Sequence, residues 1–233
     1  MSDHAQIEAF LPTVELFKGL PPASYAELGR QAHRVTYDAG AMIFGRGDTS
    51  CDLFIVSSGR VRLSVLSLEG RELSFSLAGP GSVFGEIAAF DGGIRSADAT
   101  AITAVEAIML PSAVVHKLVS TQLAFARNAI AMLGAKLRAT DQQLESVALH
   151  DIEVRLARFL LGVIRQQCPP DAPAINQVIK LEMSQSELAL LIGASRPKVN
   201  AALALLEADG AIIRRGEIIE CRMPRLKVSA AVV

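Results

Sequence analysis

Short runs of mainly apolar residues recur between about residues 35 and 110, separated by glycines. Residues 61–66, Val-Arg-Leu-Ser-Val-Leu, alternate over most of the segment, which is typical of a strand with one buried face. Three more short runs of mainly apolar residues lie at 42–44, 53–56 and 73–75, with glycines between them. Because glycine adopts the positive φ of tight turns, this pattern predicts a sandwich or roll of short strands.

The hydrophobic spacing changes after residue 122, where glycine and proline become rare. Apolar residues then recur at the a and d positions of a heptad, and Thr140 occupies a polar position within this seam. The spacing predicts one long helix over about 122–150 that pairs with a copy of itself in a homodimer. The alternative is a helix packed on its own domain. The apolar seam residues are Ile130, Leu133, Leu137, Leu144 and Val147.

Two other helices are predicted from their ends. Two prolines precede a short helix over 24–32, for which Ser24 is the expected N-cap. Apolar residues at helical spacing predict another helix over 152–167, which ends at Cys168 because two prolines follow. A proline-rich loop then continues to residue 173.

A stretch that begins at Ser184 predicts two short helices joined by a turn. Ser184 and Glu187 have the S-x-x-E spacing of a capping box, and Gly193 permits a sharp turn after the helix that they open. Ser195 is the expected N-cap of the second helix, whose first turn tolerates Pro197 because N–H groups there lack intrahelical partners. The order predicts a helix-turn-helix, and the alternative is an ordinary pair of helices in a helical domain.

The second of these helices has a predicted buried side and a predicted exposed side. The inward residues, at spacings of 4 and 3, are Val199, Leu203 and Leu206. We expect Arg196, Lys198 and Asn200 to be exposed, where arginine and lysine suit guanine or phosphate and asparagine suits adenine. Residues 211–221 then predict a hairpin that turns at Gly216, which would be the wing of a winged helix-turn-helix.

Charge and hydropathy add only a little to this picture. The net charge of −1 gives no indication of a polyanionic partner, but residues 151–233 carry 11 basic and 9 acidic side chains, as a small DNA-binding domain would. No apolar run reaches the roughly 18 residues that cross a bilayer, and the N-terminus lacks the pattern of a signal peptide. We therefore expect a cytoplasmic protein without a membrane partner.

The cysteines and the polar residues give no sign of catalytic or metal chemistry. Cys51, Cys168 and Cys221 lie far apart without paired spacing, which argues against a disulfide framework, a zinc site or an iron–sulfur cluster. Serine, histidine and aspartate occur without the spacing of a catalytic motif. The expectation is therefore no enzyme activity, no metal and no prosthetic group.

Two motifs resemble those of the Crp-Fnr family of transcription regulators, and the resemblance covers nearly the whole chain. The Gly-x-Ser-Arg-x-x-Val run of the family's helix-turn-helix is matched from Gly193 to Val199, but Pro197 and Lys198 stand where the best-known members have glutamate and threonine. The operator sequence of those members therefore cannot be carried over. The phosphate-binding cassette of the family's cyclic-nucleotide domains is matched at Gly85, Glu86, Ile87, Arg95, Ser96 and Ala97.

The residue types of this cassette suit a cyclic nucleotide. Arg95 would bind the cyclic phosphate with a charge-assisted fork, and the Ser96 hydroxyl would donate to another phosphate oxygen. Glu86 would accept from the ribose 2′-hydroxyl, and Gly85 would allow close backbone approach. One alternative is a cassette that no longer binds a nucleotide, in a regulator that responds to redox state, haem or dimer concentration. The other is a β-roll that regulates an enzyme.

The resemblance also implies a role for the long helix and a choice of nucleotide. Thr140 matches a threonine that contacts adenine in the best-known members, whose next residue, a serine, reaches the nucleotide of the other subunit and is Asp141 here. Because a carboxylate accepts hydrogen bonds and guanine offers more donors, both cyclic AMP and cyclic GMP are candidate effectors.

The implied fold is α+β. It comprises an antiparallel β-roll sensor with an N-terminal helix over 1–121, a dimerisation helix over 122–150 and a winged helix-turn-helix over 151–233. The implied partners are double-stranded DNA with a near-palindromic operator and RNA polymerase. The expected DNA-binding residues are Ser184, Gln185, Ser195, Arg196, Lys198 and Asn200.

Overall fold

The computed structural model describes residues 3–67, 72–169, 175–181 and 183–231. The chain divides into two compact units, Met1–Arg138 and Ala139–Val233, and the division falls inside the long helix α5 (Leu123–Leu149). Each unit has a hydrophobic core of its own. The three-part division at residues 121 and 150 stays a prediction.

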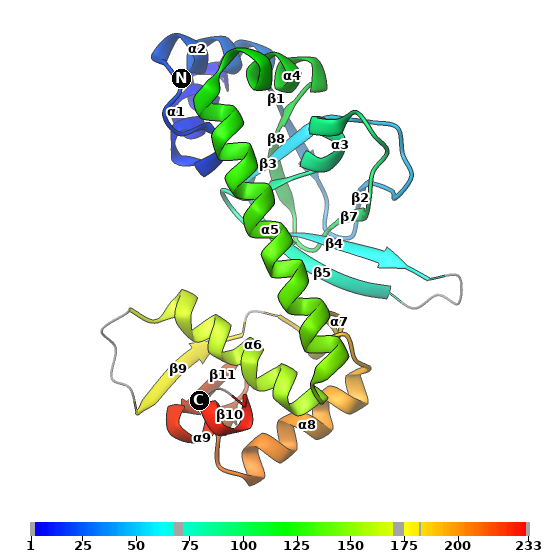
Figure 1. Cartoon of the computed structure of the whole chain (residues 1–233), viewed down its shortest axis with the longest axis vertical. Coiled ribbons are helices and arrows are strands. Elements are labelled where there is room, and N and C mark those ends of the chain that lie inside the picture. The colour runs from blue at the N-terminus through cyan, green and yellow to red at the C-terminus, as the bar shows by residue number, and fades with distance from the viewer. Residues whose placement is uncertain (1–2, 68–71, 170–174, 182, 232–233) are drawn as a thin grey trace. The chain divides into compact units, whose positions relative to one another are not determined.

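The first unit contains a roll of two four-stranded antiparallel sheets (Figure 1), with strand orders β1-β8-β3-β6 and β2-β7-β4-β5. Four of these strands, β2 to β5, contain the four runs that the hydrophobic pattern predicts. The strands are β1 (His33–Tyr37), β2 (Met42–Phe44), β3 (Leu53–Ser58), β4 (Val61–Leu66), β5 (Glu72–Ala78), β6 (Val83–Phe84), β7 (Asp98–Ala101) and β8 (Val105–Leu110).

Aromatic rings fill the interior of the roll. The rings of Phe54 and Phe84 stack with their centroids 5.1 Å apart, and Phe44 lies 5.9 Å from the first and 6.0 Å from the second. Such pairs contribute about 0.5–1.5 kcal/mol beyond the area that they bury. The turn from β3 to β4 needs Gly59, which has a φ of +84° and whose Cβ, if present, would lie 2.2 Å from the carbonyl oxygen of Ala104. The predicted role of glycine in these turns is therefore confirmed here.

A layer of helices covers the sheet that contains β1, β8, β3 and β6 (Figure 1). The beginning of α5 belongs to this layer, because Phe125 is fully buried with its ring 5.4 Å from that of Phe17. The predicted N-cap role of Ser24 is wrong: α2 begins at Pro22, since the φ of proline suits the first helical position. The layer comprises α1 (Asp3–Phe10), two short 3₁₀ turns at Leu11–Thr13 and Glu15–Phe17, α2 (Pro22–Gln31), α3 (Glu86–Asp91) and α4 (Ser112–Thr121).

The long helix is confirmed, and its apolar seam is exposed. Ile130, Leu137 and Leu144 have 71, 63 and 68% of their surface exposed, which is unusual for side chains of this size. Leu133 is also exposed, whereas the side chain of Val147 lies outside the described residues. Pairing of this seam with a second copy stays a prediction.

The second unit consists of helices packed around a small sheet of order β10-β11-β9 (Figure 1). Helix α6 (Ile152–Gln167) has the predicted bounds and buries Leu156 and Leu160 against α8. The predicted hairpin is confirmed and turns at Gly216, which has a φ of +66°. The remaining elements are β9 (Asn176–Lys180), α7 (Gln185–Ile192), α8 (Arg196–Ala208), β10 (Ile212–Arg215), β11 (Ile218–Arg222) and α9 (Met223–Ser229).

Among the residues that the structure describes, no single helix is long and apolar enough to cross a bilayer. Helices α7 and α8, which are bent by 93° at their junction, meet the same criteria only when taken together.

Candidate functional site

The cassette that the sequence singles out begins at the junction of β6 and α3. Gly85 has a φ of +74° and is the N-cap of α3, so the chain turns sharply between the strand and the helix. A Cβ at this position would lie 2.6 Å from Nη1 of Arg95 and 3.1 Å from the carbonyl oxygen of Asp52. Glycine is therefore required by the backbone and by the close approach of the guanidinium.

Arg95 is almost completely buried at this junction, with 2% of its surface exposed. Its guanidinium donates to the carbonyl oxygens of Gly85 and Asp52, both at 2.8 Å, and to Oγ of Ser50 at 3.2 Å. The ring of Phe44 lies 4.1 Å from the guanidinium carbon. Burial lowers the pKa of Arg95 from its ordinary value, but arginine stays protonated in proteins. The predicted cation is therefore present, held by partners that the sequence analysis missed.

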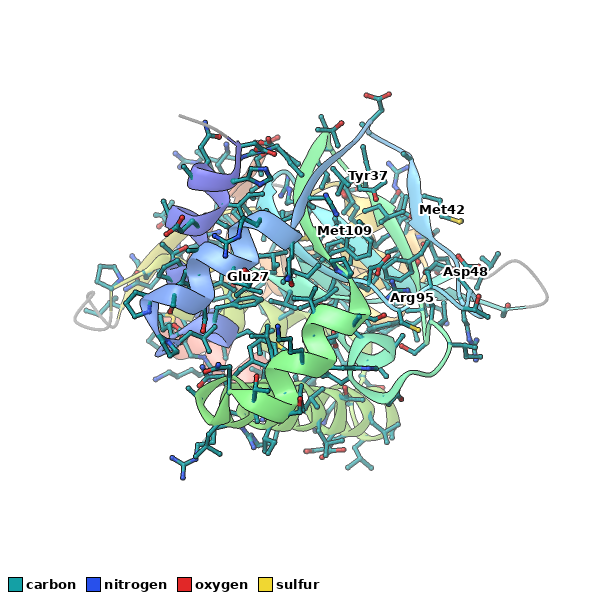
Figure 2. All side chains as sticks on the ribbon, turned by 90° about the horizontal axis from the view of Figure 1, so that it is seen from above. Glu27, Tyr37, Met42, Asp48, Arg95 and Met109 are labelled. Atoms are coloured by element: carbon teal, nitrogen blue, oxygen red, sulfur yellow. The ribbon has the colours of Figure 1, made fainter. Side chains whose placement is uncertain are left out.

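Two of those partners, Ser50 and Asp52, come from the loop between β2 and β3. The same loop is joined to the backbone of Arg95, because Arg95 N donates to Asp48 O at 2.9 Å and Gly47 N donates to Arg95 O at 2.8 Å. Figure 2 labels Asp48 of this loop and Arg95. Ser50 and Asp52 lie more than 40 residues before Arg95 in sequence. No local pattern in the sequence indicates these contacts, which arise from the closure of the roll.

Glu86, the residue after Gly85, is held by a lysine from the long helix. Its side chain is 6% exposed, and its Oε1 lies 2.8 Å from Nζ of Lys136. The same Nζ donates to the carbonyl oxygen of Val83 at 3.1 Å. The sequence analysis also missed Lys136, although it stands four residues, about one helical turn, before Thr140.

A small cavity brings together the six cassette residues that the sequence predicts: Gly85, Glu86, Ile87, Arg95, Ser96 and Ala97. Phe75 and Ile87 contribute exposed apolar surface to its lining. The Ser96 hydroxyl is exposed and has no hydrogen bond to another described residue. The cavity has a volume of about 50 Å³, whereas small-molecule pockets usually measure about 300–1,000 Å³. The enclosed part of this open cavity is therefore smaller than a whole nucleotide.

Thr140 and Asp141 are exposed residues of α5. They belong to the second unit, whereas the residues of the cavity belong to the first. The structure thus brings six of the eight predicted nucleotide-binding residues together, and the roles of Thr140 and Asp141 stay predictions.

The second unit contains the predicted helix-turn-helix. Ser184 and Glu187 form both hydrogen bonds of the capping box, Glu187 N to Ser184 Oγ at 3.2 Å and Ser184 N to Glu187 Oε2 at 2.6 Å. Gly193 ends α7 in the left-handed region with a φ of +68°. Arg155 of α6 stabilises this end, because its Nη1 donates to the carbonyl oxygen of Ile192 at 2.8 Å. Helix α7 is thus fixed at both ends.

The predicted DNA-binding residues lie near the beginnings of α7 and α8. Ser195 occupies the N-cap position of α8, but its hydroxyl makes no capping hydrogen bond. Arg196 and Lys198 are exposed as expected. Asn200, which we expected to be exposed, is half-buried, and its Oδ1 is buried without a described partner, because α8 turns it toward the edge of the packed side. Ser184 and Gln185 are exposed at the beginning of α7.

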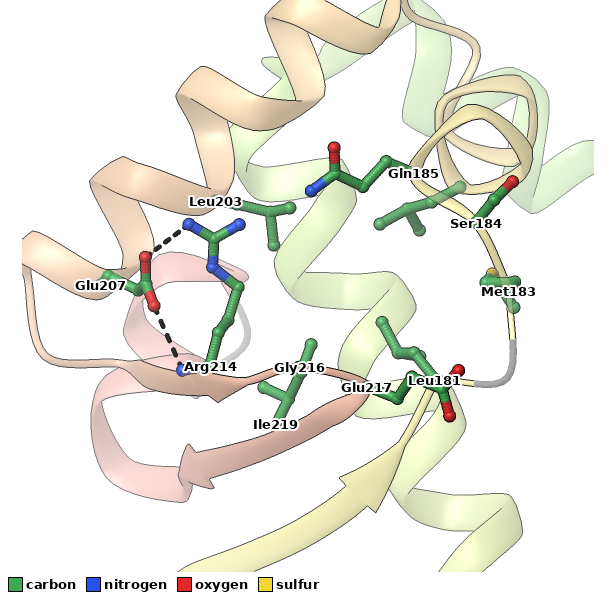
Figure 3. Close-up of a pocket in the computed structure, with 11 residues that line it drawn as sticks. Leu181, Met183, Ser184, Gln185, Leu203, Glu207, Arg214, Gly216, Glu217 and Ile219 are labelled. Carbon is green, nitrogen blue, oxygen red and sulfur yellow. Dashed lines mark hydrogen bonds and ion pairs between the residues drawn. The ribbon is translucent and has the colours of Figure 1, made fainter.

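The wing is anchored to α8 by one ion pair. Glu207 accepts from Arg214 N at 3.1 Å and from Arg214 Nη2 at 2.6 Å (Figure 3). This hydrogen bonding to Arg214 lowers the pKa of the Glu207 carboxyl. The pair lies in a groove of about 360 Å³, which also contains Ser184 and Gln185 from the beginning of α7. The geometry places the wing and both helices around one groove.

Two family models match this chain. The model of the cyclic nucleotide-binding domain matches residues 34–122, and the model of the Crp-like helix-turn-helix domain matches residues 154–228. The first match contains the whole cassette, and the second contains α7, α8 and the wing hairpin.

Full-length relatives show similarity over both units. The chain is 29% identical over 213 residues to the CRP-like cAMP-activated global transcriptional regulator of Mycobacterium tuberculosis, covering 91% of this chain and 94% of that protein. It is 33% identical over 201 residues to the cyclic AMP receptor protein of Thermus thermophilus, covering 86% and 88%. The structure of FixK2 from Bradyrhizobium japonicum matches with a TM-score of 0.74 at 24% identity, over 87% of this chain and 98% of FixK2.

Proposed function

The chain belongs to the Crp-Fnr family of DNA-binding transcription regulators that carry a cyclic nucleotide-binding domain, and we propose that cyclic AMP controls its affinity for DNA. The observation that carries this proposal is the gathering of Arg95, Glu86 and Ser96 around one cavity beside a helix that leads into the second unit. The proposed form is a cytoplasmic homodimer.

Arg95 has donors left for a cyclic phosphate. A guanidinium carries five N–H groups, and its hydrogen bonds to Gly85, Asp52 and Ser50 use three of them. The two that remain, one on each Nη, would each donate to a phosphate oxygen. Burial of the guanidinium strengthens this attraction, since the local dielectric is lower than that of water. The exposed Ser96 hydroxyl supplies a further donor.

Glu86 recognises the ribose in this proposal. Lys136 contacts Oε1 of the carboxylate, which leaves Oε2 to accept from the 2′-hydroxyl. Because Lys136 belongs to α5, the orientation of the ribose-binding carboxylate and the position of the helix depend on each other. Lys136 is therefore a positioning residue that couples the cavity to the helix.

A nucleotide would extend beyond the enclosed 50 Å³ or so of the cavity into its open part. A ligand shifts an equilibrium only when its affinity differs between two states. We propose that the nucleotide binds best to a state in which the cavity lining accommodates the whole ligand. Phe75 and Ile87, which expose apolar surface at the cavity, are suited to cover the purine in that state.

The relatives from Mycobacterium tuberculosis and Thermus thermophilus are named for cyclic AMP, which makes it the first candidate effector here. Cyclic GMP is the second, because the carboxylate of Asp141 can accept from the N1–H and amino groups of guanine. Thr140 and Asp141 are proposed to contact the base once the long helices pair.

The exposed seam of α5 supports the proposed dimer. Ile130, Leu133, Leu137 and Leu144 present apolar surface at heptad spacing, and burying each large side chain stabilises the paired state by about 1.5–3 kcal/mol. Two paired copies carry two recognition helices. They would bind a near-palindromic operator whose half-site centres lie about one helical turn apart.

We propose that the beginnings of α7 and α8 contact the DNA. We also propose that RNA polymerase binds the dimer once the dimer is on its operator. Ser184, Gln185 and Ser195 would contact phosphates, and Arg196 and Lys198 would reach the bases or phosphates of the major groove. Asn200 would reach a base only after its half-buried side chain turns outward. The domain division at residues 121 and 150 is part of the same proposal.

The test combines calorimetry with DNA binding. The purified protein is titrated with cyclic AMP and cyclic GMP in parallel, and its affinity for a selected operator is measured with and without each nucleotide. Binding of either nucleotide with a rise in operator affinity supports the proposal. DNA binding that no nucleotide changes would instead indicate a regulator that responds to another signal.

A further inference from the structure

The face of α8 that points away from the core carries almost no hydrogen-bonding side chains. The buried residues Val199, Leu203 and Leu206 define the packed side of the helix. At 100° per residue, the opposite side passes through Pro197, Ala201, Ala204 and Ala208. All four are exposed.

The polar residues of α8 lie to either side of this line. Arg196 and Lys198 are exposed in the first turn, and neither makes a hydrogen bond or ion pair with another described residue. Asn200 is turned toward the packed side, and its Oδ1 is buried. Beyond the first turn, the exposed face of α8 therefore carries the methyl groups of its alanines, with Leu205 beside them.

We propose that α8 reads its operator in two chemically different ways, by hydrogen bonds from Arg196 and Lys198 in its first turn and by methyl contacts from Ala201 and Ala204 to thymine further along. This inference rests on the proposed function, in which α8 enters the major groove. In that groove each thymine exposes a C5-methyl group, and alanine is one of the side chains that contact it. Short side chains also allow the helix backbone to approach the base edges closely.

The proposal has a consequence for the operator. A methyl contact distinguishes thymine from cytosine by the C5 substituent alone, with no hydrogen bond involved. The part of each half-site that faces Ala201 and Ala204 should therefore be rich in thymine on one strand. Replacing such a thymine with deoxyuridine should weaken binding. At the base pairs that face the first turn of α8, the same replacement should leave the affinity unchanged.

The experiment removes single methyl groups from the DNA. An operator is selected from a random double-stranded library with the full-length protein and cyclic AMP, and each thymine of one half-site is replaced in turn by deoxyuridine. Burial of one methyl group corresponds to about 0.8 kcal/mol, or about fourfold in affinity. We expect such a loss at one or two positions of the half-site, measured by fluorescence anisotropy.

A protein variant tests the same contact from the side of the protein. In Ala201→Gly the sensitive thymine loses its contact, so the thymine and deoxyuridine operators should bind with equal affinity. Ala208→Gly, at the far end of the same exposed line, is the matched control and should keep the fourfold difference. A merely structural effect of glycine would weaken both operators equally and leave their ratio unchanged.

Two negative outcomes are distinguishable. If the selected operator binds specifically and no deoxyuridine replacement changes its affinity, the methyl-contact inference is wrong and the proposed function stands. If the library yields no specific sequence with or without nucleotide, the proposed function fails, and the inference fails with it.

Discussion

Nζ of Lys136 lies 2.8 Å from Oε1 of Glu86, so a residue of the long helix holds the carboxylate that follows Gly85 at the cavity. The carboxylate is almost completely buried, and a buried charge without a partner is strongly unfavourable. The pair therefore makes the position of α5 and the shape of the cavity depend on each other. In the proposed function, the signal from the nucleotide to α5 begins at this ion pair.

Replacing Lys136 tests this coupling. Lys136→Met removes the cation that orients Glu86, and we expect nucleotide affinity to fall by about 1 kcal/mol, the scale of one hydrogen bond. The ratio of operator affinities with and without saturating cyclic AMP should also fall toward one. Lys136→Arg keeps the charge and should keep most of both properties. Normal stimulation in the methionine variant would show that the signal does not pass through this pair.

Arg95→Ala should abolish most nucleotide binding. Truncating one partner of a buried charged contact costs roughly 2–5 kcal/mol, and calorimetry measures the loss. The variant also leaves the carbonyl oxygens of Gly85 and Asp52 without their donor, so the first unit should lose roughly 1–3 kcal/mol of stability per unsatisfied group.

Arg62→Ala is the matched control for this prediction. Arg62 belongs to the same roll but pairs with Glu72 outside the cassette, so its loss should leave nucleotide affinity unchanged. Wild-type nucleotide affinity in a folded Arg95→Ala protein would mean that the cassette does not bind the phosphate.

The seam of α5 can be tested with a single charge. Leu137→Glu places two carboxylates in the proposed dimer interface, and we expect dissociation to become easier by roughly 3 kcal/mol or more, because neither charge has a partner. Analytical ultracentrifugation measures the change. Ala135→Glu adds the same charge at an exposed position outside the seam and should leave the dimer intact. Equal behaviour of the two variants would place the interface elsewhere.

The ion pair between Glu207 and Arg214 should give the second unit a defined pH dependence. Because the pKa of Glu207 is lowered in the folded state, folding is favoured above the ordinary glutamate value of about 4.3, and this advantage is lost as the pH falls through the lowered value. Glu207→Gln should therefore reduce stability at pH 7 by about 1 kcal/mol, and less at pH 3.5.

Glu217→Gln is the control for the pH dependence. Its carboxylate is exposed and lies 3.6 Å from Nζ of Lys180, and such surface pairs contribute little. Chemical denaturation of both variants at the two pH values separates the contributions. A constant difference between wild type and Glu207→Gln across this range would contradict the assigned role.

Local sequence rules predicted the local features well. The capping box at Ser184, the left-handed Gly193 and the turn at Gly216 depend on a few neighbouring residues, and all three are confirmed. The same rules were wrong at Ser24, where two prolines already begin the helix, and incomplete at Ser195, which stands at the N-cap without making the capping bond.

Contacts between distant residues could not be read from the sequence. Two partners of Arg95, Ser50 and Asp52, come from a loop about 45 residues earlier, and Lys136 lies 50 residues after the Glu86 that it contacts. Asn200 is polar and near the beginning of its helix, yet the phase of α8 leaves it half-buried. Motifs identify the residue types of a site, whereas packing decides which of their donors and acceptors remain available.

The most direct test of the account is operator affinity measured over a range of cyclic AMP concentrations with the full-length protein at constant salt. The account predicts that affinity rises at least tenfold, about 1.4 kcal/mol, and that half of the rise occurs near the calorimetric dissociation constant of the nucleotide. An operator affinity that stays the same from zero to saturating cyclic AMP, and likewise with cyclic GMP, would contradict it.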